Sequence, residues 1–419
     1  MKTLQGMKAW PLAMLALLGA MPCFASSCEE GCSTCTSAGA ACQSGEYDTV
    51  MGFLGVPKVK SECFQTLKLN AGCCGEVSVS ASIHDFSAPL VVVLLGIAGR
   101  TQDNFSKLWP QWLSDAGYHV LTFDSTFRPE FVQKCAHGPS GNLWAESNKV
   151  RDIVSAFLNE PQAQGRVSQI GIVGMSYGGL EALVLGEMAN EGRLPFKVSL
   201  IRAYSPPVDL RKTAEILDDW YVNDRFQYTL SELQWKFGGY GFGGYKSSKD
   251  PCCEKMSMEL LRAAISASFH EELKPVVIRN DAVFHTEALP SGDEFTKDEY
   301  AEVWGFEKYA DDLALPAWRE RIGAQNVDDM IRATDLCELL SHQPSYSKAI
   351  VAENDPFNTA EDVARLKSCA GQDHLTLLSH GGHLGYIADD DTKATLMSLF
   401  GPSERSMPAS YTQPSQEAR

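Results

Sequence analysis

The chain has 419 residues, of which 44% are hydrophobic and 21% charged, and this composition indicates a globular protein with a sizeable core. Its formal net charge of −17 disfavours nucleic acid and anionic membrane surfaces as partners. Solubility alone is sufficient to explain this charge.

The N-terminus is the one segment whose sequence suits a membrane. Met1–Lys8 carries two lysines, Ala9–Met21 is almost wholly apolar, and small residues precede a cleavage site after Ala25. The pattern predicts a signal peptide at residues 1–25, too short to span a bilayer. We therefore expect an exported protein, periplasmic or secreted, with no stable membrane insertion after cleavage. A lipid anchor is the less favoured alternative, because Pro22 stands where a lipoprotein signal has a small residue.

The cysteines agree with export. One of the 13 lies in the predicted signal peptide, which leaves 12: Cys28, Cys32, Cys35, Cys42, Cys63, Cys73, Cys74, Cys135, Cys252, Cys253, Cys337 and Cys369. In an exported chain this even number predicts disulfide bonds, although their pairing cannot be deduced. The first four could instead bind zinc, but they lack the paired C-x2-C spacing of a zinc ribbon and no histidine is nearby. We expect residues 26–75 to form a cysteine-rich N-terminal extension.

Strand-like and helix-like segments alternate in the chain that follows. Glu76–His84 alternates between apolar and polar residues, which predicts a half-exposed strand, and the apolar run Leu90–Leu95 predicts a buried one. Further strands are expected at Tyr118–Asp124, Gln169–Val173, Val198–Tyr204, Lys348–Glu353 and His374–Leu378. Helices are expected at Phe105–Ala116, Leu143–Leu158, Leu180–Ala189, Thr359–Lys367 and about Asp391–Leu399. The alternation predicts an α/β fold, with a mostly parallel central sheet flanked by helices.

The alternation stops between Ser205 and Ser347. This stretch contains helix-like pieces and many acidic and aromatic residues, which predicts an inserted helical cap. Within it, Phe237–Tyr245 interleaves aromatic residues with glycines and fits a mobile lid and an ordinary surface loop equally well. The expected boundaries are 76–205 for the first part of the core, 206–346 for the cap, 347–400 for the second part of the core and 401–419 for a flexible polar tail.

Residues 174–179 read Gly-Met-Ser-Tyr-Gly-Gly and lie between the strand-like run Gln169–Val173 and the helix-like run Leu180–Ala189. This is a G-x-S-x-G pentapeptide in a strand–turn–helix setting, where the glycines allow a turn too sharp for side chains. Such a turn holds the Ser176 hydroxyl clear of the sheet, at the N-terminus of the following helix. A tight packing turn is the alternative, but the flanking strand and helix favour a nucleophile.

A serine nucleophile needs a base, and the base needs an orienting acid. In this architecture the acid and then the histidine follow the serine along the chain, each in a loop after a strand. Asp355 follows one predicted strand on a proline-fixed turn, and His383 follows the next strand among glycines. We prefer His383 to His380 because its backbone is the more permissive. We prefer Asp355 because Glu353 lies within a predicted strand and Asp373 precedes the next one.

The third requirement is an oxyanion hole, a pair of backbone N–H groups aimed at the charge that develops on a carbonyl oxygen. Tyr177, directly after the nucleophile, is expected to supply one N–H group. Ile97 is expected to supply the other, from the glycine-containing loop after the strand Leu90–Leu95. A plain strand-to-helix turn is the alternative interpretation of that loop.

Four motifs in this chain share their order and spacing with a known family. They are G-M-S-Y-G-G around Ser176, S-P-P at 205–207, E-N-D-P-F around Asp355 and H-G-G-H-L-G-Y around His383. The chain resembles the α/β-hydrolase superfamily over about residues 85 to 400, and within it the abhydrolase-domain carboxylesterases. The resemblance implies a serine esterase or lipase-like fold with a triad of Ser176, Asp355 and His383. It is weakest in the cap, and members often have His-Gly where this chain has Leu95-Gly96.

These residues predict an exported serine hydrolase that cleaves small-molecule or lipid-like carboxylic esters through an acyl-enzyme on Ser176. No metal or organic cofactor is needed for this chemistry. An acyltransferase, a lipase or a peptidase on the same triad is the alternative, and a catalytically silent binding protein is less favoured because no triad member is missing. A thiol–disulfide protein is disfavoured because Cys32-Ser-Thr-Cys35 lies outside the sheet region. Acyl and alcohol specificity and oligomeric state do not follow from the sequence.

Overall fold

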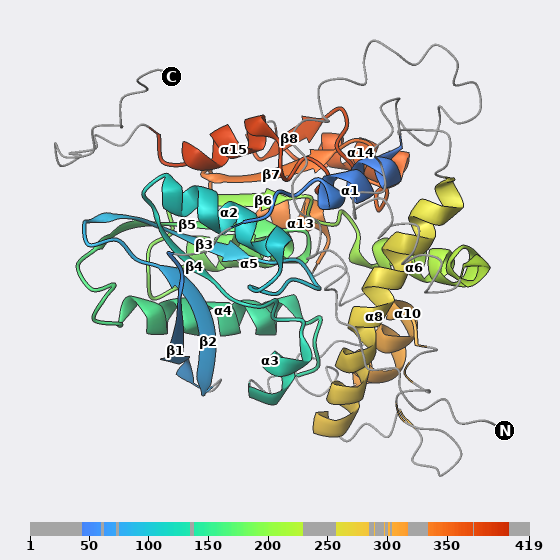
Figure 1. The fold of residues 1–419 in the computed structure, drawn as a ribbon, viewed down its shortest axis with the longest axis horizontal. Coiled ribbons are helices and arrows are strands. Elements are labelled where there is room, and N and C mark those ends of the chain that lie inside the picture. Colours follow the sequence, from blue (N-terminus) through green and yellow to red (C-terminus); the bar gives the residue numbers. More distant parts are fainter. Residues whose placement is uncertain are drawn as a thin grey trace, which may run out of the picture.

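An eight-stranded sheet with helices on both faces forms the centre of the molecule (Figure 1). The structure, a computed structural model, describes residues 44–59, 63–72, 75–134, 138–228, 257–284, 289, 297, 301, 304–316, 334–371 and 373–401. Several predictions fall outside these ranges: the signal peptide, the first four cysteines of the mature chain, the Phe237–Tyr245 segment and the tail from residue 402. So do Cys73, Cys74, Cys135, Cys252 and Cys253.

The sheet has the strand order β1-β2-β4-β3-β5-β6-β7-β8. Its strands are β1 (Gln65–Asn70), β2 (Glu76–Ser82), β3 (Ala88–Leu94), β4 (His119–Thr122), β5 (Val167–Met175), β6 (Leu200–Tyr204), β7 (Ser347–Ala352) and β8 (Leu375–Leu378). β2 runs antiparallel to both of its neighbours, β1 and β4, and the remaining neighbouring pairs are parallel. The predicted mostly parallel sheet is confirmed.

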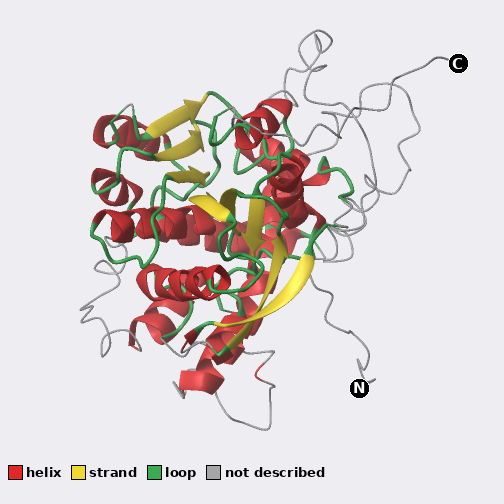
Figure 2. Cartoon of the chain, turned by 90° about the vertical axis from the view of Figure 1, so that its left-hand side faces the viewer, coloured by secondary structure: helices red, strands yellow, loops and turns green. Residues whose placement is uncertain are grey.

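Helices cover both faces of this sheet (Figure 2). The α-helices in the described part of the chain include α1 (Gly45–Leu54), α2 (Asn104–Asp115), α3 (Pro129–Lys134), α4 (Leu143–Leu158), α5 (Tyr177–Asn190), α6 (Leu210–Asn223), α8 (Met258–Phe284), α10 (Phe306–Lys308), α13 (Leu336–Ser341), α14 (Ala360–Cys369) and α15 (Asp390–Met397). Successive residues of β3 point to opposite faces: Val92 packs in the layer of α4 and α5, and Val93 in the layer of α2 and α15. Both valines are fully buried, which explains the continuous apolar run of this strand.

Helix α1 and strand β1 lie in the stretch that the sequence assigned to the N-terminal extension. β1 pairs with β2 over its whole length, so the sheet begins before residue 76. Only two alternating leucines, Leu67 and Leu69, mark the apolar face of β1, which is too short a pattern to predict a strand by itself. α1 begins after Ser44, whose hydroxyl accepts a hydrogen bond from the Tyr47 N–H at 3.1 Å.

Between β6 and β7 the described chain is helical. Helices α6, α8 and α10 and the π-helical turn η4 (Tyr309–Ala314) lie together at one side of the sheet (Figure 1). α8 is 27 residues long and packs against α6, α3 and α1. In the part of the chain that is described, no helix combines the length and the apolar character needed to cross a membrane.

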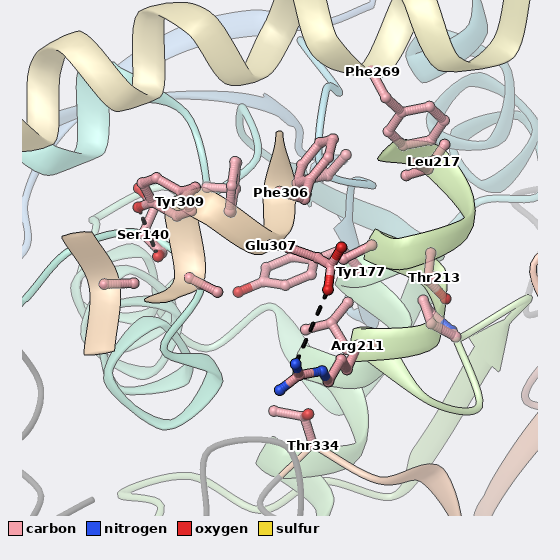
Figure 3. A pocket seen from close by; sticks show the side chains of 18 of the residues that line it. Ser140, Tyr177, Arg211, Thr213, Leu217, Phe269, Phe306, Glu307, Tyr309 and Thr334 are labelled. Atoms are coloured by element: carbon pink, nitrogen blue, oxygen red, sulfur yellow. Dashed lines mark hydrogen bonds and ion pairs between the residues drawn. The ribbon is translucent and has the colours of Figure 1, made fainter. Parts of the chain in front are cut away.

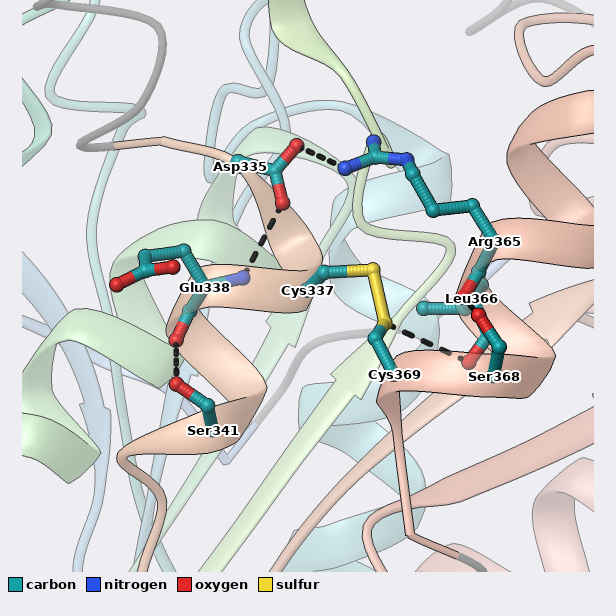
Figure 4. The surroundings of a disulfide bond; sticks show 8 residues. All are labelled: Asp335, Cys337, Glu338, Ser341, Arg365, Leu366, Ser368 and Cys369. Carbon is teal, nitrogen blue, oxygen red and sulfur yellow. Dashed lines mark hydrogen bonds and ion pairs between the residues drawn. A yellow bond between two sulfur atoms is a disulfide. The ribbon is translucent and has the colours of Figure 1, made fainter.

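A disulfide joins Cys337 of α13 to Cys369 of α14, with their Cα atoms 5.6 Å apart (Figure 4). Beside it, the Asp335 carboxylate accepts a hydrogen bond from Arg365 of α14 at 2.6 Å. The bond ties the chain entering β7 to the helix that follows it. One of the expected disulfides is thereby confirmed, and Cys63 is an exposed free thiol.

Candidate active site

Ser176 stands at the turn between β5 and α5 with a strained backbone, φ 52° and ψ −119°. The glycines around it are required by close approach. A Cβ atom on Gly174 would lie 2.0 Å from the Gly178 carbonyl oxygen, and one on Gly178 would lie 2.6 Å from the Leu94 carbonyl oxygen. The turn therefore has the geometry of a nucleophile elbow, which presents the serine at the carboxyl end of the sheet.

The structure brings together the three side chains that the sequence singled out. The Ser176 hydroxyl lies 2.8 Å from His383 Nε2, and His383 Nδ1 lies 2.8 Å from Asp355 Oδ2. Because a carboxylate can only accept, the Nδ1–H group donates to Asp355 and leaves Nε2 free to accept from the serine. All three side chains are buried, so bulk water does not compete for these hydrogen bonds.

Two contacts fix the acid and the ring of the base. The second oxygen of Asp355 accepts a hydrogen bond from the Phe357 backbone N–H at 3.0 Å. The Phe357 ring meets the His383 ring edge-on, with centroids 4.6 Å apart. The rivals lie elsewhere: Glu353 pairs with a surface lysine at 2.7 Å, and the His380 side chain is exposed.

Ile97 and Tyr177, the expected oxyanion residues, both line a cavity together with Ser176. Ile97 belongs to the β3–α2 loop, residues 95–103, and a Cβ atom on Gly96 would lie 3.4 Å from Ser176 Cβ. Tyr177 is the first residue of α5, where backbone N–H groups have no partner within the helix. The structure thus places both residues beside the serine.

The cavity beside Ser176 is apolar and has a volume of about 130 Å³ (Figure 3). Its deep walls are aromatic and aliphatic side chains from the core and the helical insertion: Phe127, Leu217, Phe269, Phe306, Tyr309 and Phe357. Arg211 and Glu307 line it where it nears solvent, with side chains 36% and 42% exposed and charged atoms 4.0 Å apart. Figure 3 shows the ion pair between Arg211 and Glu307 among the side chains that line the cavity.

Buried acids lie behind the nucleophile. The Tyr177 hydroxyl donates to Glu146, and the Thr126 hydroxyl donates to Glu181. Burial, followed by the nearby Glu146 charge, raises the pKa of Glu181 to about 8. Burial also raises the pKa of Glu146, which Lys149 opposes. The sequence analysis missed this cluster because two glutamates on different helices carry no motif.

A buried ion network joins the β3–α2 loop to the helical insertion. Glu272 of α8 accepts from Arg100 at 3.0 and 3.1 Å and from Arg128 at 2.6 Å. Desolvation raises the pKa of the neighbouring Asp103 to about 6, against the opposing effect of the Arg100 charge. Helix α8 therefore holds the loop that carries Ile97 through charges that are shielded from water.

Four further side chains hold the loop that carries His383; two of them, Ser205 and Asn354, lie in the S-P-P and E-N-D-P-F motifs, and the sequence analysis gave none of the four a role. They bind four consecutive backbone N–H groups: Asp48 binds Gly381 at 3.1 Å, Asn354 binds Gly382 at 2.9 Å, Thr49 binds His383 at 2.8 Å and Ser205 binds Leu384 at 3.2 Å. Two of these side chains come from α1. No local pattern could have indicated them, since α1 precedes the loop by more than 300 residues.

The strand order, the antiparallel β2 and the serine at the sharp β5–α5 turn together define a fold. The chain has the α/β-hydrolase fold. No protein-family model and no curated protein sequence matches it. The narrower resemblance to abhydrolase-domain carboxylesterases stays a prediction.

Solved structures similar to this chain include esterases of two archaea. An esterase of Pyrococcus furiosus is 14% identical, with a TM-score of 0.42 over 80% of this chain and 89% of its own. An esterase of Pyrobaculum calidifontis is 14% identical, with a TM-score of 0.42 over 85% of this chain and 88% of its own. A 2,6-dihydroxy-pseudo-oxynicotine hydrolase is 14% identical, with a TM-score of 0.40 over 84% of this chain and 71% of its own. The fold assignment rests on this chain's own topology rather than on such distant likenesses.

Proposed function

We propose that the protein is an exported carboxylic-ester hydrolase that works through an acyl-enzyme on Ser176. The observation that carries the proposal is the hydrogen-bonded series Ser176–His383–Asp355, with both heavy-atom distances at 2.8 Å, beside an apolar cavity. Export is supported by the signal-like residues 1–25 and by the disulfide between Cys337 and Cys369, because disulfides persist in oxidising compartments.

Acylation begins when the Ser176 oxygen attacks the ester carbonyl carbon and passes its proton to His383 Nε2. The negative oxygen of the tetrahedral intermediate is held by the backbone N–H groups of Ile97 and Tyr177. His383 then gives its proton to the leaving alkoxide, which departs as an alcohol. Asp355 stabilises the imidazolium that forms between the two transfers.

Deacylation repeats the sequence with water. His383 takes a proton from a water molecule, the resulting oxygen nucleophile attacks the acyl carbon, and the carboxylic acid leaves as the proton returns to Ser176. An acyltransferase would use an alcohol or amine in place of water at this step. Every bond is made and broken by groups of this chain and the two substrates.

The apolar lining of the cavity favours binding of an apolar acyl or alkyl group of the substrate. Its walls offer rings and aliphatic chains to hydrocarbon, and ligand pockets of this kind use a few polar groups for orientation. A volume of about 130 Å³ is small for a ligand site and suits a short hydrocarbon chain or a single ring. We therefore expect short and medium-chain esters to react faster than long-chain ones.

Covalent labelling with a fluorophosphonate tests the proposal. We expect the mature protein to be labelled at Ser176, and Ser176→Ala to abolish labelling and to lower ester hydrolysis by roughly 10⁶-fold. Labelling that persists in the variant would show that another residue is the nucleophile. A folded wild-type protein that takes no label would support a binding protein on a hydrolase scaffold, and the mass of the secreted chain would show whether it begins after Ala25.

A further inference from the structure

The loop that carries His383 has no regular structure of its own. This histidine loop, residues 379–389, runs between the end of β8 and the start of α15. Three of its residues have positive φ angles: Gly381 at 128°, Gly382 at 55° and Leu384 at 61°. Glycines adopt such angles freely, but Leu384 keeps its positive φ only where its surroundings impose it.

Helix α1 supplies two of the four side-chain acceptors that bind the backbone N–H groups of this loop. Thr49 accepts from the His383 N–H at 2.8 Å and donates its own hydroxyl proton to the Gly45 carbonyl oxygen at 2.6 Å. The second bond fixes the direction of the hydroxyl, so a lone pair faces the histidine amide. Asp48 accepts from the Gly381 N–H at 3.1 Å and from the Asn354 amide at 2.8 Å.

Asp48 therefore joins the acid loop to the histidine loop. Asn354 directly precedes Asp355, and its side-chain oxygen accepts from the Gly382 N–H at 2.9 Å. One carboxylate of α1 thus binds both the histidine loop and the residue beside the acid. The relative position of Asp355 and His383 therefore depends on α1, a helix that precedes the whole sheet in the chain.

The backbone of α1 also fits these loops too closely for a larger residue. A Cβ atom on Gly45 would lie 1.6 Å from the Asn354 carbonyl oxygen. One on Gly52 would lie 2.2 Å from the Gly385 carbonyl oxygen. The backbone of α1 therefore lies so close to the two loops that only glycine fits at these two positions.

We propose that α1 is a part of the catalytic apparatus, and that Thr49 and Asp48 are positioning residues that set the His383 ring between Ser176 and Asp355. The proposal rests on the proposed function of these three residues. Thr49 and Asp48 touch the histidine backbone and its neighbours, so they act through His383. We therefore expect α1 to affect the rate of proton transfer rather than substrate binding, because no residue of α1 lines the cavity beside Ser176.

Thr49→Val in the full chain removes the hydrogen bond and keeps the shape of the side chain. We expect kcat for p-nitrophenyl butyrate to fall roughly 10- to 100-fold with KM unchanged, because small misplacements of reacting groups have effects of this size. The rate of fluorophosphonate labelling at Ser176 should fall by the same factor. Thr49→Ser restores the hydroxyl and should return both rates to within about threefold of wild type.

A purely structural role would give a different result. In that case Thr49→Val would lower thermal stability but leave kcat of the folded fraction at the wild-type value, which would overturn the proposal. If Thr49→Val does not fold, Asp48→Asn provides the same test, because it keeps an oxygen acceptor and weakens the bond to Gly381. Here we expect a smaller fall in kcat, of about tenfold or less.

Failure of the proposed function would be distinguishable. If the folded wild type takes no fluorophosphonate label, the hydrolase proposal fails first. The downfield NMR signal of the His383 Nδ1 proton then reports the hydrogen bond to Asp355 without any reaction. A shifted or broadened signal in Thr49→Val, and a normal one in Thr49→Ser, would support positioning by α1, whereas an unchanged signal in Thr49→Val would overturn it.

Discussion

The two loops beside Ser176 are held in different ways. The histidine loop is fixed by side-chain oxygens that accept from four consecutive backbone N–H groups, and three of the four acceptors are uncharged. The β3–α2 loop has hydrogen bonds to the end of β4 and, in addition, ionic contacts, since Glu272 of α8 binds Arg100 of this loop and Arg128 beside it. Helix α1 contacts the first loop directly, and the helical insertion contacts the second.

The two sets of supports therefore act on different candidate site residues, His383 in one loop and Ile97 in the other. A movement of α8 would remove the ionic contact between Glu272 and Arg100 of the loop that carries Ile97, and would leave its hydrogen bonds to Asp124 and Ser125 in place. The hydrogen bonds that hold the backbone of the histidine loop come from α1 and the ends of β6 and β7, and α8 reaches this loop only indirectly, through its contact with α1, where Arg262 pairs with Glu46 at 3.0 Å. The direct supports of His383 therefore lie in the sheet and α1, whereas the supports of the loop that carries Ile97 are shared between the end of β4 and the insertion.

The largest effect is expected on the histidine side. Asp355→Asn keeps the shape of the acid but no longer enforces the tautomer in which Nε2 accepts, so kcat should fall by about 10⁴-fold. Ester hydrolysis measured together with thermal unfolding will separate this loss from misfolding. A loss of less than about tenfold would show that Asp355 does not orient the histidine.

A smaller effect on activity and a larger one on stability are expected from Glu272→Gln. Removing one partner of a buried charge network leaves Arg128 with only the exposed Glu130 as a counter-charge, which costs up to about 3–5 kcal/mol of the free energy of unfolding. We expect kcat to fall by roughly 10²-fold at most, the effect of losing one oxyanion donor. Denaturant unfolding and steady-state kinetics measure the two quantities.

Glu130→Gln is the matched control, because Glu130 also contacts Arg128, at 3.3 Å, but its side chain is 57% exposed. An exposed pair contributes little, so this variant should lose less than about 1 kcal/mol and keep the wild-type kcat. Equal losses in the two variants would contradict a special role for α8 in holding the β3–α2 loop.

The smallest expected effect is on the pH dependence of stability, and it arises from Glu181 of α5, which lies in neither loop. Folding raises the pKa of Glu181 from its ordinary value of 4.5 to about 8, so the folded protein holds a proton that the unfolded chain has released. Stability from this group is therefore lost as pH rises from about 4.5 to about 8. Glu181→Gln is neutral throughout and still accepts from Thr126. Its melting temperature should fall less than that of the wild type across this range, and parallel curves would refute the assignment.

The sequence was sufficient to find Ser176, Asp355 and His383 because each lies in a loop after a strand whose apolar residues are recognisable. The ends of parallel strands meet at one edge of the sheet, so order along the chain predicts proximity in space. The predicted strands before these residues agree with β5, β7 and β8 to within two residues at their ends.

What the sequence could not predict depends on contacts between distant segments. Helix α1 is short and has no strong apolar stripe, and the hydrogen bonds and glycine contacts that seat it against Asn354 and the histidine loop leave no local pattern in the sequence. In the sequence, nothing distinguishes Glu272 from an exposed glutamate of a helix. Only the structure shows that Arg100 and Arg128 bind it. Each of these interactions joins residues more than 100 positions apart.

Helix α1 has a consequence for how the protein is made. It is synthesised early, yet the backbone amides that Asp48 and Thr49 bind emerge more than 300 residues later. Until then α1 has no loop to dock on, and the histidine has not been added to the chain. The contact between Ser176, His383 and Asp355 can therefore form only in the last stage of synthesis or after release, and a chain still attached to the ribosome at the insertion does not contain it.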